Sequence, residues 1–291
     1  MERTCRAAPR ITPGRTVNGT TVATFCYDNA DRLTSLTSTT APYNAYTGTI
    51  TYDQWGNTTV IGGDTHVYDG ADRHVATYTP NPTSPTSSVI YTRDATDNIV
   101  ERKLNGTTVA RYSGPFTLDA TNTVTDITVS LPGGAVLRYT PASYTGTWTY
   151  PNLAGHNIAT ANNTGVKQGT TTYYDPDGML TGGSLPDTHP GNFDNTWHGS
   201  GDVRVETETG LQPVIEMGAR QYHIALGRFL EIDPIEGGVH NDSGYVADQT
   251  NDSDLSGTGK YWYCLFNTRV CNFANRISAS VRAWADAQAR T

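Results

Sequence analysis

The chain has 291 residues, enough for one large domain or two of ordinary size and for a substantial hydrophobic core. Charged residues make up 16%, against roughly 25% in an average globular protein, so long helices rich in charge are not expected. The net charge of −8 argues against general nucleic-acid binding, and no apolar run is long enough for a membrane span. The 29 glycines, the 17 tyrosines and many threonines favour β-sheet.

The N-terminus and the cysteines do not determine the compartment. The first residues contain no apolar stretch typical of a secretion signal, so the chain is cytosolic, is exported by another route, or lacks its start. Cys264 and Cys271 are close enough in sequence to form a disulfide, whereas Cys5 and Cys26 are far apart. No spacing of cysteine or histidine typical of zinc occurs, and neither a metal nor another cofactor is expected.

A tyrosine–aspartate unit recurs along the chain. Complete copies begin at Tyr27, Tyr52, Tyr68 and Tyr174, and a degenerate copy begins at Arg93. Residues before the tyrosine alternate as in a β-strand, and the aspartate can accept hydrogen bonds from the backbone amides that follow it. A glycine, or an Asp-Arg or Asp-Asn step, then permits a turn into the return strand. The pattern therefore predicts a series of β-hairpins that winds into one long sheet.

The rest of the chain up to residue 210 fits the same fold class. Residues 127–160 keep the strand pattern, with turns at 132–134 and after 148–151. Residues 181–202 are rich in glycine, proline, aspartate and asparagine, so they are expected to form a connecting loop. No long helix is predicted in this part, and the chain is expected to be all-β.

The tyrosine–aspartate units resemble the YD repeats of Rhs proteins, which also occur in the C components of insecticidal toxin complexes and in teneurins. Residues 215–238 are similar to the Rhs-repeat-associated core, and residues 254–257 resemble the end of that core. The resemblance covers about residues 20–258. The residues at core-motif positions are Gly218, Arg220, Tyr222, Gly227, Arg228, Phe229, Asp233 and Pro234.

The resemblance implies an architecture. YD-repeat β-hairpins would wind as part of a hollow β-shell, or partial cocoon, that the core plugs at one end. Three parts are then expected: a YD-repeat shell segment over residues 1–210, the Rhs-associated core over 211–258, and a variable tail over 259–291. Complete shells of this kind are much longer, so the chain is expected to be the C-terminal end of such a shell, or a relic of one.

The resemblance also implies self-cleavage just after the core, with the released toxin kept inside the shell. Asp233 is the predicted catalytic aspartate, and the predicted cut lies between Thr258 and Gly259. Aspartyl proteolysis needs a second acidic group, for which Asp242 and Asp248 are the candidates. The alternative is that Asp233 only caps a turn before Pro234.

Other charged and titratable residues of the core are expected to have structural roles. Arg220 and Arg228 are expected either to pair with acids inside the core or to form surface salt bridges. His223 is given no catalytic role.

The tail is expected to contain a short helix. Phe273, Ile277, Val281 and Trp284 fall at helical spacing among basic residues. A helix docked on the shell is favoured over one that lies on a membrane surface. The tail is shorter than most enzyme toxins and carries no nuclease or transferase motif.

The first functional hypothesis is the C-terminal portion of an Rhs-type polymorphic toxin that encapsulates or presents an effector, secreted or at the cell surface. Its predicted partners are its own effector segment, an immunity protein and a secretion machine. The alternatives are a carbohydrate-binding or adhesive surface protein, in which Trp55 and Trp148 would supply stacking platforms, and a non-functional fragment.

Overall fold

The fold is all-β, as predicted. The computed structural model describes residues 14–17, 19–29, 32–41, 43–183, 192–201, 203–207, 210–233, 243–246 and 253–257. These residues form 23 strands and two short 3-10 helices, and no α-helix occurs among them. The helix predicted in the tail lies outside the described residues. No described helix is long and apolar enough to cross a membrane.

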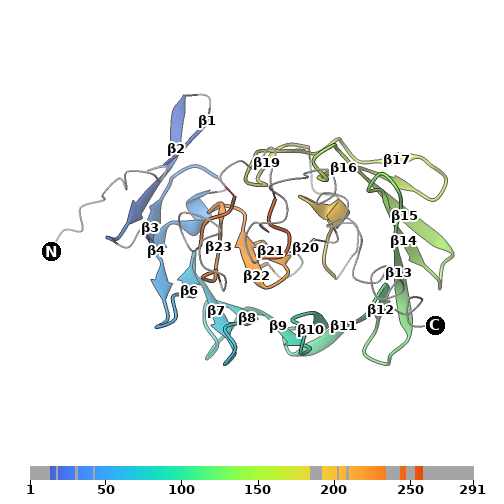
Figure 1. Ribbon diagram of the computed structural model, residues 1–291, viewed down its shortest axis with the longest axis horizontal. Coiled ribbons are helices and arrows are strands. Elements are labelled where there is room, and N and C mark those ends of the chain that lie inside the picture. The colour runs from blue at the N-terminus through green and yellow to red at the C-terminus, as the bar shows by residue number, and fades with distance from the viewer. Residues whose placement is uncertain are drawn as a thin grey trace, which may run out of the picture.

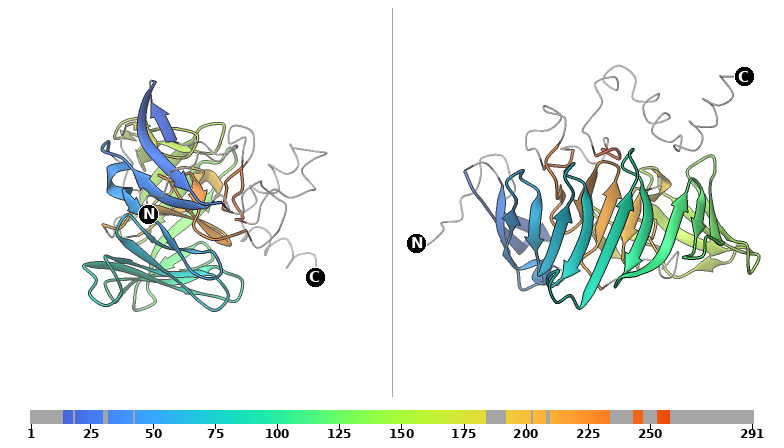
Figure 2. Two further views of the ribbon diagram at one scale, coloured as in Figure 1. Left: turned by 90° about the vertical axis from the view of Figure 1, so that its left-hand side faces the viewer. Right: turned by 90° about the horizontal axis from the view of Figure 1, so that it is seen from below.

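Most of the strands form a curved wall, residues 14–183, in which neighbours in sequence pair in antiparallel fashion. The wall opens with a four-stranded sheet: β1 (Gly14–Val17), β2 (Thr20–Tyr27), β3 (Leu33–Thr37) and β4 (Gly48–Thr49), with the 3-10 helix η1 (Tyr43–Tyr46) between β3 and β4. It continues as thirteen strands in chain order: β5 (Thr51–Tyr52), β6 (Thr58–Ile61), β7 (Asp64–Tyr68), β8 (His74–Thr79), β9 (Ser87–Arg93), β10 (Ile99–Leu104), β11 (Thr107–Ser113), β12 (Phe116–Leu118), β13 (Val124–Ser130), β14 (Val136–Thr140), β15 (Thr145–Pro151), β16 (Asn157–Asn162) and β17 (Lys167–Gln168). A separate hairpin ends it: β18 (Tyr173–Tyr174) and β19 (Leu180–Gly182). The predicted winding of consecutive hairpins is therefore confirmed (Figure 2).

The aspartate of each unit forms the turn that the sequence predicted. Asp69 accepts hydrogen bonds through Oδ1 from the amides of Ala71 and Arg73, at 2.9 and 3.2 Å. The residue three positions after the aspartate has a positive φ, 58° at Asp72 and 68° at Asp97. The same bonds recur at Asp53, Asp94, Asp119, Asn152, Asn162 and Asp175.

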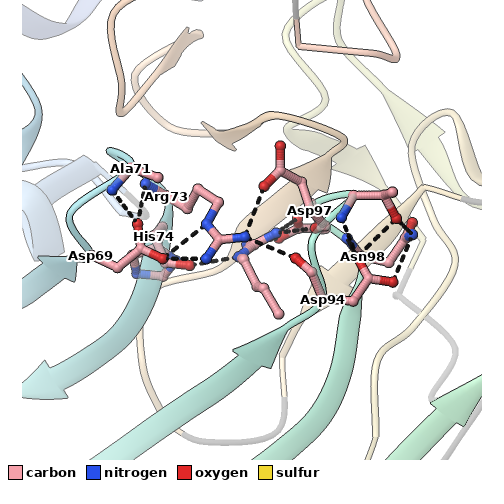
Figure 3. Close-up of polar contacts among 10 residues, drawn as sticks. Asp69, Ala71, Arg73, His74, Asp94, Asp97 and Asn98 are labelled. Carbon is pink, nitrogen blue, oxygen red and sulfur yellow. Dashed lines mark hydrogen bonds and ion pairs between the residues drawn. The ribbon is translucent and has the colours of Figure 1, made fainter.

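Adjacent turns are also tied to one another along one rim of the wall. Arg73 bonds Asp69 within its own turn and reaches the next turn, where it donates to the carbonyl of Asp94 at 2.8 Å and to Asp97 at 3.2 Å (Figure 3). In the same way Asn57 donates to Asp72 of the following turn, at 3.1 Å. The repeat thus fixes the spacing of neighbouring hairpins as well as the shape of each turn.

The described residues from 192 to 257 form a plug that lies in the hollow of the wall (Figure 1). Its sheet consists of β20 (Arg204–Glu206), β21 (Val214–Met217), β22 (Arg220–His223) and β23 (Arg228–Phe229), and the 3-10 helix η2 (Gly199–Gly201) precedes it. Among the described residues there are three hydrophobic clusters, and each contains plug residues. The largest is centred on Trp197, Tyr222 and Phe229, and the other two place Ala225 and Phe193 against wall strands.

Candidate functional site

Ion pairs join the plug to the inner face of the wall. Arg93 on β9 donates to Glu216 of β21 through two bonds, of 2.7 and 3.0 Å. Arg102 on β10 makes a similar pair with Glu206 of β20, and both side chains are almost completely buried. Buried charges are tolerated only when they are paired and hydrogen-bonded. These pairs therefore fix how the plug sits against the wall.

In the segment predicted as a connecting loop, residues 181–202, the described residues 192–201 are largely irregular and lie buried inside the wall. Asn157 of β16 donates its backbone amide to the carbonyl of Thr196 at 2.9 Å and its side-chain amide to the carbonyl of Asn195 at 3.1 Å. Trp197 is fully buried, and a Cβ added at Gly178 would lie 2.7 Å from its ring. The segment is thus the first part of the plug.

The core-motif residues build the centre of the plug. Tyr222 is fully buried and donates its hydroxyl to the carbonyl of Asp177 in the wall at 3.0 Å. Gly227 has a φ of 65°, and a Cβ there would approach the carboxylate of Asp177 to 3.0 Å. Arg228 is buried and lies over the ring of Tyr27, with its guanidinium carbon 5.9 Å from the ring centroid.

An arginine between two aspartates is the most distinctive polar arrangement in the plug. Nη2 of Arg220 lies 3.0 Å from Oδ2 of Asp233 and 2.9 Å from Oδ2 of Asp254. All three side chains are at most 4% exposed. The guanidinium also stacks on Phe229, 3.7 Å from its ring centroid. The structure therefore brings together two buried carboxylates whose positions differ by 21 residues.

The segment just before the predicted cut, Ser256 and Gly257, is held against this site. Nε of Arg220 donates to the carbonyl of Gly257 at 2.6 Å, and the amide of Ala219 donates to the carbonyl of Ser256 at 3.0 Å. A Cβ at Gly218 would lie 2.5 Å from the oxygen of Ser256, and one at Gly257 would lie 2.4 Å from the oxygen of Met217. Both glycines also have positive φ, so this close approach of two backbones requires glycine on each side.

Tyr245 fixes Asp254 from the other side. Its hydroxyl accepts the backbone amide of Asp254 at 3.1 Å, and its ring packs among Trp197, Tyr222 and Phe229. Burial raises the pKa of the Tyr245 hydroxyl above its ordinary value, so the phenol stays neutral.

The other site residues predicted from sequence lie outside the described residues: Pro234, Asp242, Asp248, Thr258 and Gly259. Asp233 is described, and its buried carboxylate pairs with Arg220. Arg220 pairs with acids inside the plug, which is the buried alternative of the two considered from sequence. Sequence reasoning did not nominate Asp254 as an acid of the site; its place at the start of the closing core motif was the available signal.

The arrangement offers carboxylate chemistry and no metal site. Among the described residues no group of three or more histidine, cysteine, aspartate or glutamate side chains is placed to hold a metal ion. Two carboxylates can divide the roles of general base and general acid, and an adjacent guanidinium can orient them and stabilise a developing oxyanion.

The fold of this chain is similar to parts of solved toxin complexes. The chain is similar to the Photorhabdus luminescens Tc holotoxin pore, solved with an aspartate-to-alanine substitution in TccC3, at 16% identity over 82% of this chain, with a TM-score of 0.53. It is similar to the TcdB2–TccC3–TEV structure at 16% identity over 80% of this chain, TM-score 0.55, and to TcdB2–TccC3–Cdc42 at 15% over 82%, TM-score 0.51. The chain spans only 13 to 14% of the length of these proteins.

The chain thus has the fold of the Rhs and YD-repeat shells, as its sequence motifs predicted. No family model matches the sequence, and no curated protein matches it.

Proposed function

We propose that this chain is the closing end of a toxin-type β-shell and that it cuts itself between Thr258 and Gly259. The arrangement of Arg220, Asp233 and Asp254 carries the proposal, because it places two buried carboxylates and a cation beside the carbonyl of Gly257. The scissile carbonyl would belong to the next residue along the chain. The similarity in fold to Tc toxin structures supports the shell part of the proposal.

The chemistry proposed is hydrolysis of one amide bond. One of the two carboxylates, Asp233 or Asp254, takes a proton from water as the oxygen attacks the Thr258 carbonyl carbon. Arg220 stabilises the charge on the carbonyl oxygen, and the second acid protonates the nitrogen of Gly259 as the carbon–nitrogen bond breaks. The products are a carboxylate at Thr258 and a free amine at Gly259.

The released segment, residues 259–291, would be the effector or what remains of one. An immunity protein against that segment and a secretion machine would be its further partners, and the protein would act outside the cell that makes it. Cys26 of β2 is disulfide-bonded, which suits an oxidising compartment.

Mass spectrometry of the purified full chain tests self-cleavage. The proposal expects two fragments, residues 1–258 and 259–291, from the wild type, and an intact chain of 31.4 kDa from Asp233→Asn and from Asp254→Asn. Asp126→Asn is the matched control, because Asp126 is a buried aspartate of the wall that bonds Thr140. A wild-type chain that stays intact, or an Asp254→Asn chain that is cut at the wild-type rate, would overturn the proposal.

A further inference from the structure

All five histidines in the described part of the chain lie where the plug meets the wall. Three of them gather at β7, β8 and β22, and two gather at the β15–β16 turn and the start of the plug; we call these contacts the histidine seam. Four are buried, and one is half-buried. The members of the seam are His66, His74 and His223 in the first group and His156 and His198 in the second.

The first group is shielded from water and poorly supplied with hydrogen-bond partners. His66 and His74 both bond Thr77, and their ring centroids are 5.4 Å apart. His223 of the plug stands edge-on to Tyr46 of the wall, with ring centroids 4.9 Å apart. The second nitrogen of His66, that of His74 and both nitrogens of His223 make no well-formed hydrogen bond. Protonation would add a buried charge that no carboxylate bonds, with only weak backbone contacts at His74 and His223.

In the second group, one bond between wall and plug requires a neutral ring. The backbone amide of His198 in the plug donates to Nδ1 of His156 in the wall at 3.2 Å. The two rings are 4.5 Å apart, and Nε2 of His198 lies 3.5 Å from the hydroxyl of Tyr245. A proton on Nδ1 of His156 would abolish the hydrogen bond from the His198 amide, and protonation of both rings would place two cations in contact.

We propose that acid loosens the plug from the wall, because the histidine seam holds its rings neutral and opening lets them take up protons. The seam would then act as a sensor that keeps the shell closed at neutral pH and releases its closing end in an acidic compartment. This inference concerns the wall–plug contact and does not depend on the self-cleavage proposed above.

The pKa values agree in direction with the geometry. Burial lowers the pKa of His66 and His156 to about 4 and that of His198 and His223 to about 3. Burial, with His66 and Arg93 nearby, lowers the pKa of His74 well below its ordinary value. Because the folded values lie below 6.5, the closed form is favoured fully above pH 6.5 and loses stability as the pH falls from 6.5 towards 4 and 3.

The other titratable groups that face the histidine seam also affect how the opening of the seam depends on pH. Near the first group, Arg93 is paired with Glu216, and Tyr46, Tyr68 and Tyr91 stay neutral because burial raises their pKa values. Burial raises the pKa of Asp64, which lies near Tyr46, and raises that of Glu231 to about 8. Near the second group, Tyr174 and Tyr245 are neutral for the same reason, and Asp194 lies near Tyr174.

Glu231 opposes the histidines. Its buried carboxyl is protonated at neutral pH and would ionise on exposure, so acid favours the closed form here, as it does at Asp64, whose pKa burial also raises. When the pH falls from 7 to 5, linkage raises the opening constant about 20-fold for each histidine that becomes exposed on opening. It lowers the opening constant about 70-fold for Glu231. Exposure of the three histidines of the first group therefore outweighs Glu231 by about 100-fold and leaves a margin for Asp64, so the net effect of acid is to open the seam.

Hydrogen exchange followed by mass spectrometry on the full chain tests this inference. After correction for the intrinsic pH dependence of exchange, the opening constant of plug peptides over residues 214–230 should rise at least about 10-fold from pH 7 to pH 5, while peptides from β13–β15 change little. A ratio near one in the wild type would overturn the proposal.

Two variants distinguish opening caused by the histidine seam from acid destabilisation caused by other groups. The triple variant His66→Gln, His74→Gln, His223→Gln should lower the ratio of the opening constant at pH 5 to that at pH 7 at least about 20-fold, because it removes protonatable rings. A loss of stability that is the same at both pH values cancels in that ratio. Glu231→Gln should raise the ratio, since it removes one of the carboxyl groups that oppose opening in acid. If the triple variant is too unstable to measure, an unchanged or lower ratio in Glu231→Gln overturns the proposal by itself.

Discussion

Arg102 of the wall and Glu206 of the plug form a buried ion pair with two hydrogen bonds, Nε to Oε2 at 2.7 Å and Nη2 to Oε1 at 2.6 Å. Tyr91 donates a further hydrogen bond to Glu206 at 3.0 Å, and the Arg102 guanidinium lies 5.2 Å from the ring centroid of Phe193. The pair joins β10 to β20 across 104 positions of sequence. A buried, hydrogen-bonded ion pair of this kind favours a single position of the plug against the wall.

Removal of one partner of this pair is expected to be costly. Glu206→Leu leaves the Arg102 charge buried without that partner, and the free energy of unfolding should fall by about 3–5 kcal/mol. Urea unfolding followed by circular dichroism measures the change. The double variant Arg102→Met, Glu206→Leu should recover most of the loss, because it removes both charges; a double variant as unstable as the single one would contradict this explanation.

A second prediction concerns Gly218 and Gly257, the two glycines that allow residues 256–257 to approach the β21–β22 turn. Gly218→Ala and Gly257→Ala each place a Cβ within 2.5 Å of a backbone oxygen at a positive φ. Each should cost at least about 2 kcal/mol and should slow self-cleavage, because Ser256 and Gly257 move away from Arg220. Gly106→Ala is the control, since Gly106 has a φ of 81° and no atom within 4 Å of an added Cβ. Equal effects at Gly218 and Gly106 would show that the contact is unimportant.

The turn aspartates should contribute to stability in a pH-dependent way. Burial raises the pKa of Asp69, but the bonds from Arg73 and Ala71 outweigh it, and the pKa lies below its ordinary value. The contribution of Asp69 is therefore complete at neutral pH and is lost as the pH falls through the unfolded and then the folded value.

Asp69→Ala should cost about 1 kcal/mol at pH 7 and less at pH 3, measured by urea unfolding at both values. Asp69→Asn is the control, because an amide oxygen can still accept the two backbone amides. A loss that is the same at both pH values would argue that the aspartate acts through packing rather than through its charge and bonds.

The wall could be predicted from the sequence because each repeat carries its own turn. The hydrogen bonds that Asp69 accepts come from residues at most four positions away, so the local sequence alone determines the turn. The same turn occurs at Asp119 and Asn162, which were missed because no tyrosine precedes them. Tyrosine marks the strand, whereas aspartate or asparagine makes the turn.

The plug was less predictable because its contacts join residues that are distant in sequence. Asp254 was not nominated as a site acid, since its relation to Asp233 depends on Arg220 and on the path of the intervening chain. Phe193 and Trp197 lie in a segment whose composition indicates a loop, and only the enclosing wall makes that segment part of the core. Composition therefore predicted irregular backbone correctly and gave no indication of burial.

The plug packs against the inner face of the wall, and a double-mutant cycle on Arg93 and Glu216 measures that contact. Unfolding free energies would be measured for the wild type, Arg93→Met, Glu216→Gln and the double variant. The two side chains are in contact at 2.7 Å, so a coupling energy of about 1–3 kcal/mol is predicted. Effects that add to within about 0.5 kcal/mol would mean that the two side chains do not meet, and would contradict a plugged wall.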